Sequence, residues 1–155
     1  MQVTTLTQYD RRLLRALQAD CRISNQKLAE AAGMSTSACW RRVRQLENAG
    51  LIRRYTAMLE PAKAGLGFSA IVHVTLTRQT SMHVDTFVRK IVKRPEVLEC
   101  LATTGEADYH LRVVCEDLDT YNDFLENFLF RLPGIDQVRT NLVLREIKME
   151  TALGI

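Results

Sequence analysis

The sequence predicts an α+β protein with two domains, an N-terminal winged helix-turn-helix and a C-terminal ferredoxin-like β-α-β-β-α-β sandwich. Three observations predict it. Residues 10–50 hold three segments with apolar side chains at helical spacing. Residues 68–147 hold four strand-like segments interrupted by two helical ones. Between them, 61–67 carries a proline and two glycines. We therefore expect residues 1–60 to form the winged helix-turn-helix domain, 61–67 a linker and 68–155 the second domain.

The first helix is predicted over residues 10–19, because Leu13 and Leu17 are one helical turn apart. Thr7 and Asp10 have the spacing of a capping box, in which each side chain accepts a hydrogen bond from the other residue's amide. This pair therefore predicts where the helix begins.

The next two helices are predicted to meet at a sharp turn. Ser24 and Ser35 are suited to cap the second and third helices, since a serine hydroxyl accepts a hydrogen bond from a free first-turn amide. Leu28 points inward from the second helix, and Gly33 supplies the turn. Gly50 ends the third helix, where a left-handed residue is easily accommodated. This is the order of a helix-turn-helix.

The third helix has two different faces. At about 100° per residue, Cys39, Val43 and Leu46 share one stripe, which we expect to be core. The opposite stripe carries Ser37, Arg41, Arg44 and Asn48, and Trp40 and Arg42 lie on the flanks. Arginine binds guanine through two hydrogen bonds and asparagine binds adenine in the same way, so this face suits the major groove of double-stranded DNA. The alternative is a solvated basic helix.

The segment 51–59 is predicted to be a basic strand, the wing of the winged helix-turn-helix. Residues 1–60 hold ten Lys and Arg against five Asp and Glu, whereas the remainder holds eleven against thirteen. The first domain is thus the one suited to phosphates. The residues expected to contact DNA are Ser35, Thr36, Ser37, Trp40, Arg41, Arg42, Arg44, Asn48, Arg53 and Arg54.

Other function classes have little support in the sequence. No apolar run approaches the roughly 18 residues that span a bilayer, and no secretory signal is visible, so we expect a cytoplasmic chain that does not enter membranes. The four cysteines are scattered and are expected to be small buried hydrophobes. His73, His83 and His110 stand apart, without a second histidine or a cysteine at ligand spacing. We expect neither a metal nor a cofactor.

The second domain is predicted from alternating strand and helix patterns. Asp117 is suited to cap its second helix, and Pro133 and Gly134 to end it. The strands are expected at 68–76, 97–104, 109–115 and 135–147, with a turn at 105–108. Both helices should cover one face of the sheet, and we expect several apolar residues on the other. Such a face is usually buried by another subunit, which predicts a homodimer.

The chain resembles the Lrp/AsnC, or feast/famine, transcription regulators. The resemblance covers nearly the whole chain and is carried by the segments at 10–18, 22–25, 39–52, 95–100, 104–109 and 131–135. It implies an N-terminal DNA-binding domain and a C-terminal domain that dimerises and senses small molecules, usually amino acids. It also implies further assembly, commonly to octamers. Trp40 departs from the smaller aliphatic residue usual in the family; we expect it to pack, although contact with a thymine methyl is the alternative.

The resemblance also implies an effector site near the turn 103–108, at a contact between dimers. Gly105 would leave turn amides accessible to a carboxylate, and Asp108 would accept from an ammonium group. The alternative is that Asp108 only caps a tight turn. Glu106, another departure, would favour a basic or polar ligand or be solvated. The residues implied are Thr103, Thr104, Gly105, Glu106, Asp108, Leu118, Asn141 and Leu142.

Three functions follow as hypotheses. The leading one is a sequence-specific transcription regulator that responds to an effector such as an amino acid. The second is an architectural, nucleoid-type DNA-binding protein without effector response. The third is an enzyme, for which Asp108, His110 and Arg112 would share a strand face. The basic third helix favours DNA over catalysis, so we do not expect an enzyme.

Overall fold

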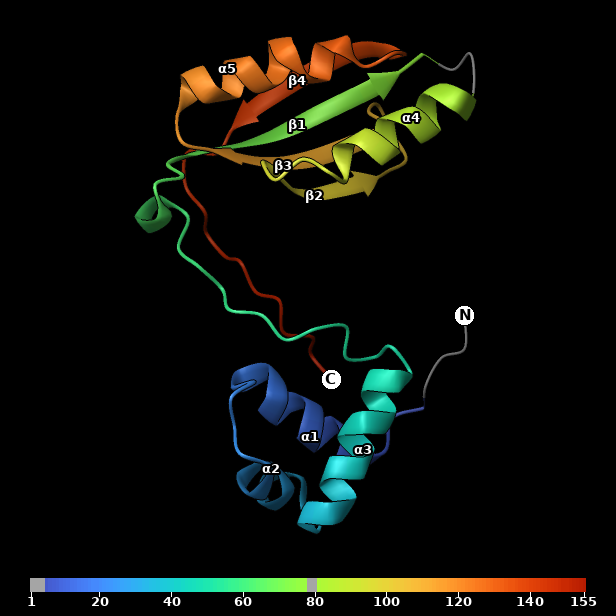
Figure 1. The fold of residues 1–155 in the computed structure, drawn as a ribbon, viewed down its shortest axis with the longest axis vertical. Helices are drawn as coiled ribbons and strands as arrows, with labels where there is room; N and C mark the ends of the chain where they lie inside the picture. The colour runs from blue at the N-terminus through green and yellow to red at the C-terminus, as the bar shows by residue number, and fades with distance from the viewer. Residues whose placement is uncertain (1–4, 78–80) are drawn as a thin grey trace. The chain divides into compact units, whose positions relative to one another are not determined.

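The computed structural model describes residues 5–77 and 81–155. They form two compact units, one made of the N-terminal residues up to Met58 with Lys148–Ile155, the other of Leu59–Ile147 (Figure 1). The sequence-based boundary assigned 148–155 to the second domain, whereas here these residues pack with the first unit. No helix among the described residues is long and apolar enough to cross a membrane.

The first unit is a three-helix bundle with α1 at Gln8–Ala19, α2 at Asn25–Ala32 and α3 at Thr36–Asn48. The predicted capping box is present: Thr7 Oγ1 accepts from the Asp10 amide, and Asp10 accepts from the Thr7 amide. Gly33 has φ +70°, the left-handed conformation that turns α2 into α3. The core is Leu13, Leu14, Leu28, Ala29, Ala32, Cys39 and Leu46.

The predicted strand over 51–59 is wrong for this structure. Residues 53–60 are without regular structure, although the basic and apolar side chains suit a strand. A strand needs a hydrogen-bonding neighbour, and none of the described residues supplies one to this segment. The three helices of the first unit therefore form without a paired wing in the single chain.

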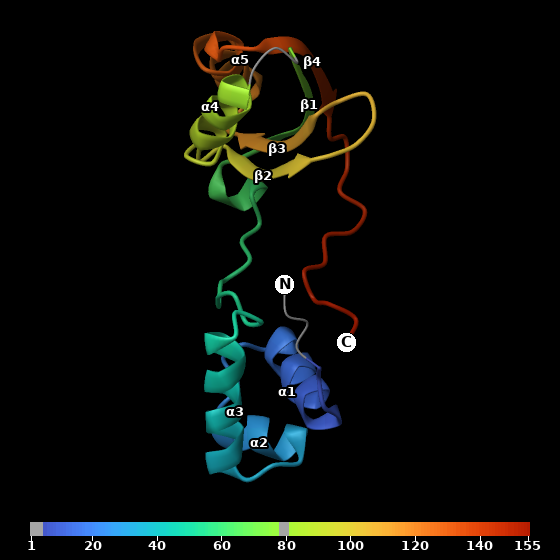
Figure 2. The same ribbon diagram turned by 90° about the vertical axis from the view of Figure 1, so that its right-hand side faces the viewer.

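The second unit is the predicted ferredoxin-like fold. Its strands are β1 at Phe68–Leu76, β2 at Val97–Ala102, β3 at Tyr109–Cys115 and β4 at Ile135–Leu142, in the order β2-β3-β1-β4 and antiparallel throughout. Helices α4 at Ser81–Ile91 and α5 at Leu118–Asn127 cover one face of the sheet (Figure 2). Short 3-10 turns at Ala62–Ala64 and Leu129–Arg131 complete the elements.

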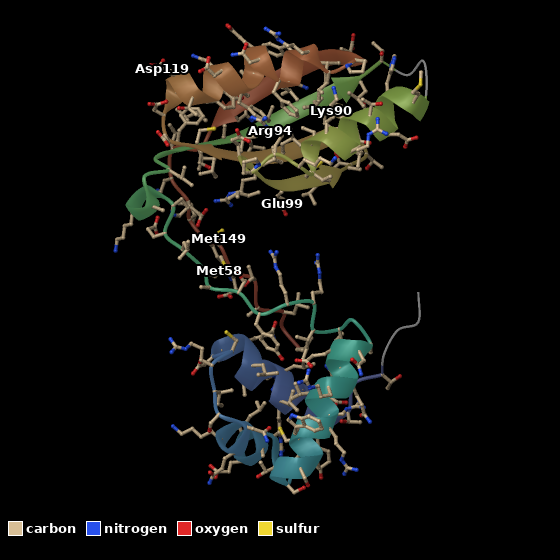
Figure 3. All side chains as sticks on the ribbon, viewed as in Figure 1. Met58, Lys90, Arg94, Glu99, Asp119 and Met149 are labelled. Carbon is tan, nitrogen blue, oxygen red and sulfur yellow. The ribbon has the colours of Figure 1, made fainter. Side chains whose placement is uncertain are left out.

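The core of this unit lies between the sheet and the two helices. Ala70, Val72, Val74 and Leu76 alternate toward the helices along β1 and are buried, as period-two side-chain geometry requires. Figure 3 looks onto this helix-covered side, where Arg94 stacks over the Phe128 ring at 4.5 Å and pairs with Glu96 at 2.6 Å. The guanidinium thereby ties the end of α4 to the α5 side of the domain.

Two strands are shorter than predicted. β4 ends at Leu142 rather than residue 147, because its partner β1 begins at Phe68 and the last ladder contact is the Val143 amide with the Ser69 carbonyl, 2.9 Å apart. β2 ends at Ala102 rather than residue 104. Beyond it the chain turns through 103–108 into β3, so the loop is longer than the predicted four-residue turn.

The open face of the sheet carries both polar and apolar side chains. Its side chains come from the strand positions that alternate with the core-facing ones. They are Ser69, Ile71, His73 and Thr75 on β1, Glu99 and Leu101 on β2, His110, Arg112 and Val114 on β3, and Gln137, Arg139 and Asn141 on β4. Ile71, Leu101 and Val114 are its apolar members, and Leu101 is 49% exposed, so the expectation of several apolar residues on this face is confirmed.

Candidate functional site

The local sequence fixes the third helix at both ends. Ser35 Oγ accepts from the Ala38 amide at 3.3 Å, and Gly50, with φ +71°, follows its last turn. Cys39 and Leu46 are buried and Val43 packs against the same cluster, so the predicted core stripe is confirmed. The orientation of α3 on the bundle is thus set by apolar packing.

The stripe opposite this core faces solvent. Arg41 and Arg44 both reach outward from its middle, one turn apart. The exposed residues of the predicted DNA-binding set are Ser35, Thr36, Ser37, Trp40, Arg41, Arg44, Asn48, Arg53 and Arg54. The face therefore offers guanidinium, hydroxyl and amide groups, the donors and acceptors that read base edges and phosphates.

Arg42 is different from its neighbours. Its Nε donates to Asp10 Oδ1 at 2.6 Å and its Nη2 to Asp10 Oδ2 at 2.8 Å, while Nη1 donates to Gln45. The Asp10 side chain is only 1% exposed. The Arg42 hydrogen bond is the main reason that the pKa of this carboxyl is lowered to about 2. Arg42 thus fixes α3 to the start of α1.

Trp40 does not pack on the core as expected. It is 54% exposed on the surface of α3, and the Arg44 guanidinium carbon lies over its ring at 5.6 Å. Arg44 Nη1 also donates to Glu47 at 3.3 Å, and Glu47 accepts from the Tyr55 hydroxyl at 3.0 Å. Trp40, Arg44, Glu47 and Tyr55 form one connected group beside the outward stripe.

The second unit carries a cavity of about 360 Å³ on the open face of its sheet. The cavity lies between the strand centres and the loop before β3, because open-face positions of three strands converge there. Its lining is His73, Thr104, Glu106, Ala107, His110, Arg139 and Asn141. Three of these, Thr104, Glu106 and Asn141, belong to the predicted effector site.

The loop that forms the rim is held at its base. The Thr103 amide donates to the Asp108 carbonyl at 3.0 Å, and Thr103 Oγ1 donates to the Ala107 carbonyl at 3.1 Å. Gly105 has φ +122°, a conformation that side chains disfavour. Among the described residues, none accepts from the backbone amides of residues 104–107. The loop therefore presents unpaired amide donors at the rim.

Asp108 has a structural contact of its own. Its Oδ2 accepts from the Leu76 amide at 2.7 Å, where the register of β1 against β4 shifts. Its backbone amide donates to the Val74 carbonyl at 3.0 Å. One carboxylate oxygen therefore stabilises the β-bulge, which is a structural role of the kind that the alternative to ligand binding gave Asp108. The other oxygen accepts no hydrogen bond from the described residues.

The charged cavity residues interact with one another. Glu106 accepts from Arg139 at 2.7 Å, and this contact lowers the pKa of the glutamate. His73 and His110 are direct cross-strand partners with ring centroids 4.6 Å apart, and Asn141 Nδ2 lies 3.1 Å from His73 Nε2. Burial lowers the pKa of His73, with His110 and Arg139 acting in the same direction. The imidazole thus favours its neutral form.

Two predicted effector residues lie elsewhere. Leu118 starts α5, beyond the far end of β3 from the loop, roughly 20 Å along the strand. Leu142 pairs with Ala70 near the start of β1, also away from the loop. Neither lines the cavity, and Thr103, Gly105 and Asp108 belong to the loop beside the cavity without being among its lining residues. Within one chain the predicted set therefore falls into two groups, one at the loop and cavity and one away from them.

Sequence reasoning missed four cavity residues as effector contacts: His73, Ala107, His110 and Arg139. Thirty-seven positions separate the histidines, and only the β1–β3 register brings them together. Strand alternation is the signal that could have placed both on the open face. No group of three His, Cys, Asp or Glu side chains suited to a metal ion occurs in the described parts of the chain.

Together, the three-helix unit with a basic exposed helix and the separate sheet domain with a polar cavity define a DNA-binding regulator with a ligand-binding domain. A family model described as Lrp/AsnC ligand binding domain matches residues 69–153, and one described as winged helix-turn-helix DNA-binding matches residues 6–53. The chain belongs to the Lrp/AsnC family of transcriptional regulators.

Curated relatives match over nearly their full length. The chain is 37% identical to the DNA-binding transcriptional activator DecR of Escherichia coli K12, covering 97% of this chain and 99% of the relative. It is also 37% identical to the leucine-responsive regulatory protein of the same strain, covering 97% and 92%.

Solved structures match equally well. A transcriptional regulator of Neisseria meningitidis in complex with L-methionine has a TM-score of 0.90 at 37% identity, with 96% of each chain covered. An AsnC family regulator from Agrobacterium tumefaciens has a TM-score of 0.89 at 32% identity, again over 96% of each chain.

Proposed function

We propose that this regulator reads DNA with the exposed stripe of α3 and binds an amino acid at the cavity of its second domain. The observation that supports the effector assignment is the loop 103–108 at the cavity. Thr104, Glu106 and Ala107 line the cavity, and the amides of residues 104–107 and one Asp108 carboxylate oxygen have no partner among the described residues. A volume of about 360 Å³ is in the range of small-molecule sites.

The chemistry of an α-amino acid fits this rim. The amides at Gly105 and its neighbours are suited to a carboxylate, as in other backbone anion sites. The free Asp108 oxygen is suited to the ammonium group, since charge-assisted hydrogen bonds are about twice as strong as neutral ones. The complex of the Neisseria meningitidis relative with L-methionine supports the same class of ligand.

On the DNA side, Arg41, Arg44 and Asn48 are proposed to contact base edges, and Arg53 and Arg54 to contact phosphates. The remaining members, Ser35, Thr36, Ser37 and Trp40, lie at the start of the helix or on its flank. Arg42 is proposed to act through Asp10 by holding the helix in place. No catalytic role is proposed for any residue, because the relatives are transcriptional regulators.

We further propose a cytoplasmic homodimer that assembles to an octamer. Exposed apolar side chains support this proposal: Leu101 on the open face is 49% exposed, and Leu144, after β4, is 91% exposed. Contact between dimers would bring Leu118 and Leu142 of one chain near the cavity of another, uniting the two groups of effector residues. Sedimentation measurements with and without effector test the assembly.

The effector is tested by a thermal-shift screen of the free amino acids on the full chain. Binding to the folded state stabilises it by about 2.7 kcal/mol at a hundredfold excess over Kd. The selected amino acid is then titrated calorimetrically into the parent, Asp108→Asn and Asp108→Ala. Asparagine keeps an oxygen for the Leu76 amide and removes the charge, so equal loss of binding in both variants identifies the charge as the cause.

The architectural alternative is separated by the same experiment. If the folded parent binds none of the amino acids and its DNA affinity is unaffected by them, the second domain serves assembly alone. If binding is unchanged in Asp108→Asn, Asp108 is removed from the site while the amino-acid assignment stands.

A further inference from the structure

Trp40 is the only tryptophan of the chain, and it stands on the helix proposed to read DNA. Half of its side chain is exposed, and it flanks the outward stripe one turn before Arg44. A tryptophan at this place presents a flat apolar surface next to the donors of the reading face. Its role follows from what Arg44 does.

Arg44 is held in a defined position. The Trp40 ring lies beneath its guanidinium at 5.6 Å, and Glu47 accepts from one of its terminal nitrogens at 3.3 Å. Glu47 is in turn fixed by the Tyr55 hydroxyl at 3.0 Å. Because Nη1 donates to Glu47, the donors that Arg44 keeps for DNA are Nε and Nη2, and guanine is bound by two such donors through O6 and N7. The guanidinium therefore has contacts with Trp40 and Glu47 before DNA binds, which reduces the cost of positioning it.

The position of the ring bears on which base can adjoin the guanine. If Arg44 binds a guanine, a ring 5.6 Å from its guanidinium carbon is near enough to reach the adjacent base, because successive bases of a strand are about 3.4 Å apart along the helix axis. Thymine alone presents an apolar group there, its 5-methyl. Polar edges of the other bases would lose water to the indole surface without gaining a hydrogen bond.

We propose that Trp40 is a specificity-determining residue that selects a thymine next to the guanine bound by Arg44. The proposal rests on the base contact proposed for Arg44 above. Trp40 acts in two ways, by orienting the guanidinium and by covering the thymine methyl. The recognised element is thus a guanine with an adjoining thymine rather than a guanine alone.

The test starts with selection of a binding duplex from a random library by the full-length protein. Each thymine of the selected duplex is then replaced singly by deoxyuridine, which removes only the methyl. Fluorescence anisotropy gives Kd for the parent, Trp40→Leu and Tyr9→Leu. Tyr9 is a matched control, because it is an aromatic residue of the same unit, 53% exposed, on α1.

When deoxyuridine replaces one thymine beside a guanine, the parent and Tyr9→Leu are expected to bind the duplex about fourfold more weakly, because burying one methyl group contributes about that factor to affinity. Trp40→Leu is expected to bind the thymine and deoxyuridine duplexes equally well. Urea unfolding of Trp40→Leu, followed by circular dichroism, verifies that the variant folds. A parent indifferent to every deoxyuridine, or a Trp40→Leu variant that keeps the same loss, overturns the proposal.

Arg44→Lys distinguishes this proposal from the one on which it rests. Lysine keeps the charge but cannot bind guanine through a planar pair of donors. If Arg44→Lys prefers guanine as strongly as the parent does, the proposed contact between Arg44 and guanine is wrong. The proposed selection of an adjoining thymine by Trp40 then fails with it. If guanine preference is lost while the parent shows no methyl effect, only the thymine selection fails.

Discussion

Asp10 and Arg42, thirty-two positions apart, form a two-pronged ion pair in which both carboxylate oxygens of a buried aspartate accept from one guanidinium. The same carboxylate caps α1 through the Thr7 amide and hydroxyl. One side chain therefore fixes both the start of α1 and the orientation of α3.

Breaking this pair should destabilise the first unit strongly. Arg42→Ala leaves a buried carboxylate unpaired and is expected to cost about 3–5 kcal/mol. Asp10→Ala loses the pair and the cap, and the double variant should cost less than the sum by about 1–3 kcal/mol. Urea unfolding followed by Trp40 fluorescence measures this unit. Arg41→Ala is the matched control, expected within about 0.5 kcal/mol of the parent.

Loss of Arg42 should weaken DNA binding through the fold rather than through sequence choice. A stable Arg42→Ala variant with relaxed sequence preference and intact non-specific binding would contradict the role assigned to it.

The same pair predicts a dependence on pH. The Arg42 hydrogen bond holds the pKa of Asp10 at about 2, below its ordinary 3.8. Because the folded pKa is lower than the unfolded one, the stabilisation is present above about pH 4 and is lost as the pH falls toward 2. The loss should be about 2 kcal/mol. Urea midpoints between pH 2 and 6 measure it, and Asp10→Asn should show a flatter profile over that range.

Alanine substitutions on the outward stripe should separate base reading from phosphate binding. Arg41→Ala and Arg44→Ala are each expected to cost about 1–3 kcal/mol on the selected duplex, with relaxed preference at one base position. Arg53→Ala should weaken all sequences alike and reduce the salt slope by about 1. Anisotropy titrations at several salt concentrations distinguish the two effects.

Arg22→Ala serves as the control for charge alone, since Arg22 is exposed in the turn before α2. Unchanged affinity in Arg41→Ala and Arg44→Ala would remove the outward stripe from the DNA interface.

Gly105 is expected to resist substitution for a conformational reason. A β-carbon there would meet nothing within 4 Å, so the cost comes from φ +122° rather than from a clash. Gly105→Val should cost about 1–3 kcal/mol in the second unit and displace the rim amides. Circular dichroism during thermal unfolding measures the first effect and amino-acid titration the second. Ala102→Val, which places the same side chain on ordinary strand backbone at the exposed end of β2 and outside the cavity lining, should retain effector binding.

Local signals predicted the fold well. Thr7, Ser24 and Ser35 cap helices as expected, and Gly33 makes the turn, because caps and turns depend on residues a few positions apart. Period-two and helical spacing were sufficient for the order of the second unit. The strand predicted over residues 51–59 was wrong, because the strand propensity of a segment carries no information on whether a pairing partner exists.

The sites were predicted only in part, because their geometry depends on long-range register. Nothing near Asp10 indicates that Arg42 will reach it, and the cross-strand meeting of His73 with His110 follows from the strand order. The exposed position of Trp40 depends on how α3 turns toward the bundle. Leu118 was assigned through the family, and its distance from the loop becomes visible only with the topology.

The segment 148–155 has a consequence for biosynthesis. Gln18 exchanges two hydrogen bonds with Leu153, Arg15 donates to the Ile155 carbonyl, and Ile155 packs against the three-helix core. These partners leave the ribosome only after all of 59–147 has been translated. At a translation rate of about 5–20 residues per second, the contacts of residues 148–155 with the three-helix bundle can form only roughly 5–20 s after the bundle has been synthesised. A prematurely released chain that lacks the end of the second unit therefore also lacks a finished DNA-binding unit.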